Sequence, residues 1–136
     1  MENKSSDVEL SGMLANSRSD DNATRAGVIA ELGRYMYRSD ARKRLEEIMI
    51  GNEIVTMRVD AAEQPTRYGG EEGLLAVLNE LGRRQDSEVD YTAYMLSELD
   101  NFGEFPVLDT ALSINEERLT PDAKRGLTDL RALMQR

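Results

Sequence analysis

Hydrophobic residues recur along most of the chain at the three- and four-residue spacing of an α-helix. The two clearest runs are Val28, Ile29, Leu32 and Met36, followed by Ala41, Leu45, Ile48 and Met49. The same spacing predicts helices over residues 22–36, 39–50, 54–62, 71–82, 89–99, 106–114 and 121–134. No stretch of four or more residues alternates apolar and polar positions between turn dipeptides, which argues against strands. The pattern therefore predicts an all-α fold.

Residues that stop or start helices lie between these runs. Gly51 and the following Asn52 are suited to a left-handed C-cap, and Pro65 is expected to end the third helix. Thr120 followed by Pro121 is typical of an N-cap and the first helical position. These signals predict helices joined by short turns.

The first 19 residues differ in composition from the rest of the chain. They are rich in Ser, Asn, Asp and Glu, and their only apolar set could form a short helix: Val8, Leu10, Met13 and Leu14. We therefore expect residues 1–19 to be a flexible or loosely capping N-terminal tail. Residues 20–136 are expected to form one helical domain, since 136 residues are an ordinary length for a single core.

One apolar stripe is repeated three times with a period of 33 residues. The three matching sets are Ala41, Leu74 and Val107; Leu45, Leu78 and Ala111; and Ile48, Leu81 and Ile114. The helices that precede them keep the same register, with Arg25, Arg58, Tyr91 and Lys124 at one offset and Val28, Ala61, Tyr94 and Leu127 at another. Three matching sets on one helical face predict stacked helix pairs that share a continuous core.

The first helix of each pair resembles that of short HEAT-like repeats. In residues 23–33 and 55–62 an Arg precedes a small or apolar run, which ends in Leu-Gly in the first case. The resemblance implies an α-solenoid of about three helical hairpins plus a C-terminal capping helix. The chain departs from the family in its shorter period, in Pro65 at the counterpart of Leu32, and in Tyr91 where an Arg is expected. Ankyrin repeats share the 33-residue period, but their Thr-Pro-Leu-His signature is missing, as is the tetratricopeptide pattern.

The amino-acid composition excludes several kinds of catalytic and metal site and disfavours some classes of partner. The chain has no Cys and no His, which excludes disulfides, Cys/His zinc sites and Ser-His or Cys-His catalytic pairs. Lys and Arg number 17 against 26 Asp and Glu, and the resulting net charge of −9 opposes direct binding to nucleic acid or to an anionic membrane. No apolar run approaches the roughly 20 residues that span a bilayer, and the first residues do not read as a secretory signal, so a cytoplasmic location is expected.

Neither catalysis nor a bound cofactor is expected. Carboxylate doublets such as Glu46-Glu47 and Glu71-Glu72 project about 100° apart on a helix and are typical of solvated surface. No spacing resembles a calcium loop, so we expect no metal site. The Gly-rich segment 68–73 is interpreted as a tight turn into a helix with an acidic first turn, which would repel phosphate.

Acidic residues gather on the predicted second helices and on the turns that lead into them. In stacked pairs these helices line the concave face, which would form an acidic wall. Tyr37 and Tyr68 lie beside turns and are candidate contacts as well, whereas Tyr94 is expected in the core. The predicted partner-binding set is Glu46, Glu47, Glu71, Glu72, Glu80, Glu104, Asp109, Tyr37 and Tyr68.

These features favour a non-enzymatic module that binds and neutralises a basic protein. A small acidic HEAT-like protein is similar to the immunity proteins of bacterial toxin systems, so the resemblance implies a cognate toxin domain as the partner. Three alternatives remain at this stage. They are a nucleic-acid-mimicking inhibitor of a defence enzyme, a HEAT-like lyase or chaperone subunit for phycobilin chromophores, and an adaptor that oligomerises through its end helices.

Overall fold

A computed structural model describes residues 4–51, 54–84 and 86–135. Within these ranges the chain is helical and contains no strand, as the spacing predicted. The helices are α1 (Lys4–Asn16), α2 (Asn22–Leu32), α3 (Ser39–Ile50), α4 (Val55–Tyr68), α5 (Gly70–Arg83), α6 (Val89–Asn101), α7 (Val107–Ser113) and α8 (Pro121–Met134). Two short 3-10 turns, η1 (Gly33–Tyr35) and η2 (Glu116–Arg118), follow α2 and α7.

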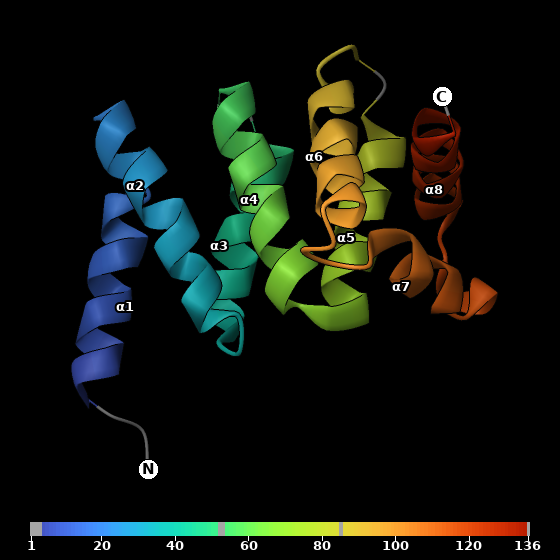
Figure 1. Cartoon of the computed structure of the whole chain (residues 1–136). Helices are drawn as coiled ribbons and strands as arrows, with labels where there is room; N and C mark the ends of the chain where they lie inside the picture. The colour runs from blue at the N-terminus through green and yellow to red at the C-terminus, as the bar shows by residue number, and fades with distance from the viewer. Residues whose placement is uncertain (1–3, 52–53, 85, 136) are drawn as a thin grey trace.

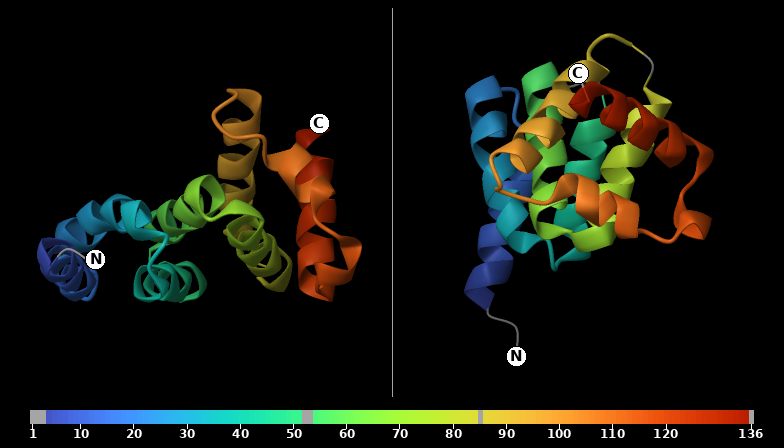
Figure 2. Two further views of the ribbon diagram at one scale, coloured as in Figure 1. Left: turned by 90° about the horizontal axis from the view of Figure 1, so that it is seen from below. Right: turned by 45° about the vertical axis from the view of Figure 1, so that its right-hand side comes forward.

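The helices follow one another along a row, with the two termini at opposite ends (Figures 1 and 2). Helices α2, α4 and α6 contact each other in sequence on one side of the row, and α3 and α5 lie on the other side (Figure 2). Helix α1 packs against α2 and α3 at the N-terminal end, while α8 packs against α5 and α6 at the C-terminal end.

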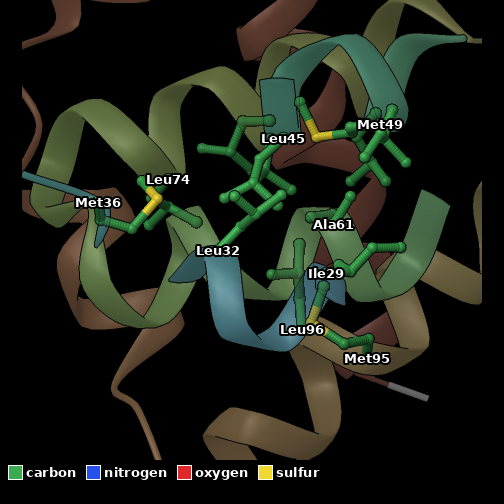
Figure 3. Packing of buried hydrophobic residues seen from close by; sticks show 14 of the residues in the cluster. Ile29, Leu32, Met36, Leu45, Met49, Ala61, Leu74, Met95 and Leu96 are labelled. Carbon is green, nitrogen blue, oxygen red and sulfur yellow. The ribbon is translucent and has the colours of Figure 1, made fainter. Parts of the chain in front are cut away.

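All nine residues of the repeated apolar stripe are buried. Leu74, Leu78 and Val107 have no exposed surface, and Ile114, the most exposed of the nine, retains only 5%. Figure 3 shows side chains from both sides of the row meeting in this core, among them Leu32 of α2, Leu45 of α3 and Ala61 of α4. The periodic positions are therefore the core positions.

Helix α8 makes its most extensive contact with α5, where two glycines let the backbones touch. A Cβ added to Gly82 would lie 1.7 Å from the carbonyl oxygen of Asp122, and one added to Gly126 would lie 2.1 Å from that of Leu78. Either atom would overlap the opposite backbone. Hydrogen bonds add to this contact, since Arg125 donates to the carbonyl oxygen of Gly82 and Thr120 donates to Asn79.

One predicted helix end and one predicted C-cap conformation are wrong. Helix α4 continues through Pro65 to Tyr68, because a proline in the last turn removes one backbone hydrogen bond and leaves the rest of the turn in place. Gly51 ends α3, but with φ −84° it is not left-handed. Thr120 does cap α8 as predicted, accepting a hydrogen bond of 3.0 Å from the amide of Ala123.

The N-terminal segment contains α1, the short helix that its apolar residues allow. Leu10 is fully buried and Met13 nearly so, and both belong to the shared core. The other attachments are polar. The hydroxyl of Tyr35 donates to Glu9 over 2.8 Å, Arg38 pairs with Asp7 at 2.6 Å, and the chain just beyond α1 is held by Arg44, which donates to Ser17.

Candidate functional site

The described residues form a groove between α3 and α5, with the C-terminal end of α4 at its base. Its volume is about 720 Å³. A smaller hollow of about 330 Å³ continues it along the same two helices and shares Glu46, Ala76 and Asn79 with it. We call these together the α3–α5 groove. It exists because α3 and α5 touch only lightly, although both pack closely on α4.

The turn between α4 and α5 shapes one end of this groove. Gly70 has φ +62°, a left-handed conformation that glycine adopts without strain, so α5 begins two residues after α4 ends. A Cβ on Gly73 would lie 2.0 Å from the carbonyl oxygen of Pro65, which shows how closely the two helices meet. The turn with an acidic first turn is confirmed, and it leaves Tyr68 at the rim with 60% of its surface exposed.

Five of the nine predicted partner-binding residues line the α3–α5 groove: Tyr37, Glu46, Tyr68, Glu72 and Glu80. Tyr37 is 68% exposed, so both tyrosines present most of their surface to solvent. Met36 and Pro65 form a buried apolar floor, beside the half-buried Leu75. The groove thus combines an apolar floor with an aromatic and charged rim.

Arginine side chains of the chain itself form ion pairs with most of the predicted carboxylates. Glu80 is buried and binds both Arg83, at 2.6 Å, and Arg84, at 3.1 Å. The hydrogen bond from Arg83 to Glu80 raises the pKa of that guanidinium. Glu47 lies 3.4 Å from Arg18 and 3.7 Å from Arg44.

The acidic set is also divided between distant surfaces. Arg118 of η2 pairs with both Glu71 and Glu72 across the chain. Glu104 lies 3.6 Å from Arg67, and Asp109 lies on α7, outside the α3–α5 groove. The structure therefore places five of the predicted residues in the α3–α5 groove and the remaining four outside its lining.

Charge in the α3–α5 groove is nearly balanced. Arg42 lies on its wall and donates to the carbonyl oxygen of Met36 over 2.9 Å. Glu72 is engaged by Arg118, whereas Glu46 has no ion-pair or hydrogen-bond partner for its carboxylate within the described part of the chain. Glu46 is therefore the carboxylate best placed to meet a cation from outside.

Sequence reasoning missed a second groove, which lies between α4 and α6 and has a volume of about 540 Å³. We call it the α4–α6 groove. Its walls carry Tyr91 and Tyr94, and the expectation that Tyr94 lies in the core is wrong, since 49% of its surface is exposed. Tyr91, Tyr94 and Glu98 follow one another at i, i+3 and i+7 on α6, a spacing that places them on one face and could have revealed this surface.

The α4–α6 groove is acidic. Asp60, Glu63 and Glu98 line it, and no Lys or Arg does. Glu63 is engaged by Arg67 at 2.7 Å, but Asp60 and Glu98 have no ion-pair partner among the described residues. Burial raises the pKa of Asp60, and the nearby charge of Glu63 raises it further.

Among the residues that the structure describes, no group of three or more Asp or Glu side chains is placed to hold a metal ion. No helix in the described ranges is both long and apolar enough to cross a membrane. No protein-family model matches the chain, and no curated protein or solved structure matches it either.

Proposed function

We propose that this chain is a non-enzymatic binding protein that captures a basic segment of another protein in the α3–α5 groove. The observation that carries the proposal is the groove itself, an open hollow of about 720 Å³ with an apolar floor and two exposed tyrosines at its rim. Ligand sites of this size combine apolar walls with a few placed polar groups.

The framework behind the proposal is a short HEAT-like array. Two observations support it: the nine stripe residues are buried, and the helices α2, α4, α6 and α8, which share the repeat register, contact one another in series. In such an array the second helices present one continuous face to a partner. Helix α8 departs from a simple repeat, because it packs more closely on α5 than on α6.

An amphipathic helix is the element that fits the α3–α5 groove best. A helix laid between two others buries its apolar residues every third or fourth position, here against Met36, Leu75 and Ala76. Tyr37 and Tyr68 supply large contact areas at low entropic cost. A lysine or arginine on the bound helix would pair with Glu46, and the net charge of −9 would speed the encounter.

In its most concrete form the proposal makes the chain an immunity protein of a bacterial toxin system. A bound chain of this size would cover a substantial part of a small toxic domain and block access to it. This form agrees with the acidic composition and with the resemblance to HEAT-like proteins.

Site-specific photo-cross-linking in the native cells tests the proposed site. A photoreactive phenylalanine analogue replaces Tyr37 or Tyr68 and, as a matched control, the equally exposed Phe102 outside the groove. We expect the first two positions to cross-link one basic protein that the third does not. Cross-linking of that protein equally from Phe102, or from none of the three, would refute the assignment of the groove.

A charge-reversed pair measures the electrostatic part once the partner is purified. Glu46→Lys should weaken its binding about tenfold and flatten its salt dependence. Glu117→Lys makes the same change in net charge at an exposed position outside both grooves and should have little effect. Equal losses in both variants would show that only overall charge matters.

A further inference from the structure

We propose that the α4–α6 groove is a second recognition site, which binds an arginine side chain from a basic peptide segment. The inference shares with the proposed function only the basic character of the partner. Binding in the α3–α5 groove does not enter it, because α3 and α5 lie on one side of the row of helices, whereas α4 and α6 lie on the other (Figure 2).

The shape of the α4–α6 groove suits a long side chain. Helices α4 and α6 run side by side in Figure 1, and side chains of both helices line the groove. Val55, Val59 and Met95 provide apolar contact for the methylene stem of an arginine. Tyr91 and Tyr94 stand on one wall with about half of each ring system exposed. A guanidinium stacks well on such aromatic faces.

The acidic residues of the α4–α6 groove favour a cation as its ligand. Asp60 on α4 and Glu98 on α6 line opposite walls, and neither has an ion-pair partner within the described ranges. A planar guanidinium offers five donors and can bind a carboxylate with two parallel hydrogen bonds while its face contacts a tyrosine. The raised pKa of Asp60 agrees with this assignment, since a bound cation would offset the desolvation and the repulsion from Glu63 that raise it.

This arrangement differs from that of most of the predicted partner-binding carboxylates. Glu47, Glu71, Glu80 and Glu104 each face an arginine of the chain itself, which already supplies the compensating charge. In the α4–α6 groove no described residue of the chain supplies such a charge to Asp60 or Glu98. An arginine from outside would provide it.

The test titrates the full chain with the blocked peptide acetyl-Gly-Arg-Gly-Arg-Gly-amide at low ionic strength, followed by backbone NMR. We expect the shifts to concentrate in α4 and α6 and the pKa of Asp60 to fall on binding. The analogue with citrulline in place of arginine has the same shape without the charge, and it should bind at least about tenfold more weakly. The lysine analogue should fall between the two.

Two double variants of equal charge provide the control. Asp60→Asn combined with Glu98→Gln should weaken binding of the arginine peptide about tenfold or more. Glu116→Gln combined with Glu117→Gln removes the same charge from an exposed turn outside the groove and should leave the affinity nearly unchanged. Tyr94→Ala should also weaken binding, whereas Tyr94→Phe, which keeps the aromatic face, should restore it.

Several results would overturn the inference. They are absence of peptide binding, equal binding of the citrulline analogue, equal losses in the two double variants, or shifts that concentrate in the α3–α5 groove. These failures are separate from those of the proposed function. Cross-linking from Tyr37 and Tyr68 can succeed when the peptide does not bind here, and the peptide can bind here when that cross-linking fails.

Discussion

The two flanks of helix α5 differ in how closely the neighbouring helices pack against them. On one flank α8 approaches so closely that Gly82 and Gly126 have no room for a Cβ. On the other flank α3 stays apart and leaves the α3–α5 groove open. The same helix therefore takes part in a contact that leaves no room for a side chain and also lines an open groove.

The contrast follows from the size of the side chains on each flank. Glycines at the crossing point allow two helix backbones to touch, which excludes solvent and any ligand. Toward α3, α5 instead presents Leu75, Ala76 and Asn79, all half-buried and without a helix laid over them. The flank of α5 toward α8 is covered by that helix, whereas the flank toward α3 is open to a partner.

The largest effect is expected in the core between the two flanks. Leu78→Asp places an unpaired charge at a position with no exposed surface, at a cost of about 5 kcal/mol or more. A domain of this size has a total stability of about 5–15 kcal/mol. We expect the variant to lose its helical circular dichroism or its cooperative melting. A folded Leu78→Asp protein would show that the repeat register is wrong.

The flank of α5 that packs against α8 should be nearly as sensitive to substitution as the core, even when only one methyl group is added. Gly126→Ala would push α8 away from the backbone of Leu78 and should destabilise the protein by about 3 kcal/mol. Gly27→Ala is the control, because a Cβ there meets nothing within 4 Å, and it should stabilise α2 by about 0.5–1 kcal/mol. Chemical denaturation measures both. Similar changes in the two variants would mean that the close α5–α8 contact does not exist in solution.

A smaller effect is expected where one arginine bridges the open flank. Arg84 donates to the carbonyl oxygens of Ile50 and Gly51 at the end of α3 and also binds the buried Glu80. Arg84→Ala leaves Glu80 with Arg83 alone and should cost about 1–3 kcal/mol. Hydrogen exchange should rise at the C-terminal end of α3 more than in α8. Unchanged hydrogen exchange at the C-terminal end of α3 would show that Arg84 does not stabilise this end of the helix.

The smallest effect is expected at the rim of the open flank. Tyr68→Ala removes a ring that is mostly exposed, so the free energy of unfolding should change by no more than about 0.5 kcal/mol. Binding of the cross-linked partner should nevertheless fall. A loss of stability as large as that of Gly126→Ala would show that Tyr68 is a structural residue and that the two flanks are alike.

Local patterns were sufficient to predict the helices but not how they pack. Helical spacing and the cap at Thr120 predicted most helix positions, and the 33-residue period predicted nine buried residues. The predicted helix end at Pro65 was wrong. The effect of a proline depends on whether it lies in the middle or in the last turn of a helix, and the spacing of apolar residues does not reveal this.

The candidate site was harder to predict, because the availability of a carboxylate depends on distant residues. Glu72 belongs to the predicted acidic wall, yet Arg118, 46 residues away, pairs with it. The sequence did not indicate a role for Asp60, because the groove that this residue lines forms only when α4 and α6 pack side by side. Composition gave the sign of the net charge, and only the fold shows which charges remain unpaired.

The polar attachments of α1 have a consequence for how the molecule opens. Two ionic or hydrogen-bonded links, Arg38 with Asp7 and Tyr35 with Glu9, lie partly in solvent, and salt weakens such links more than it weakens buried apolar contacts. The first helix should therefore separate from the rest as a local unit, at a lower free energy than global unfolding. High ionic strength would then favour a form in which the surface that α1 covers on α2 and α3 becomes exposed.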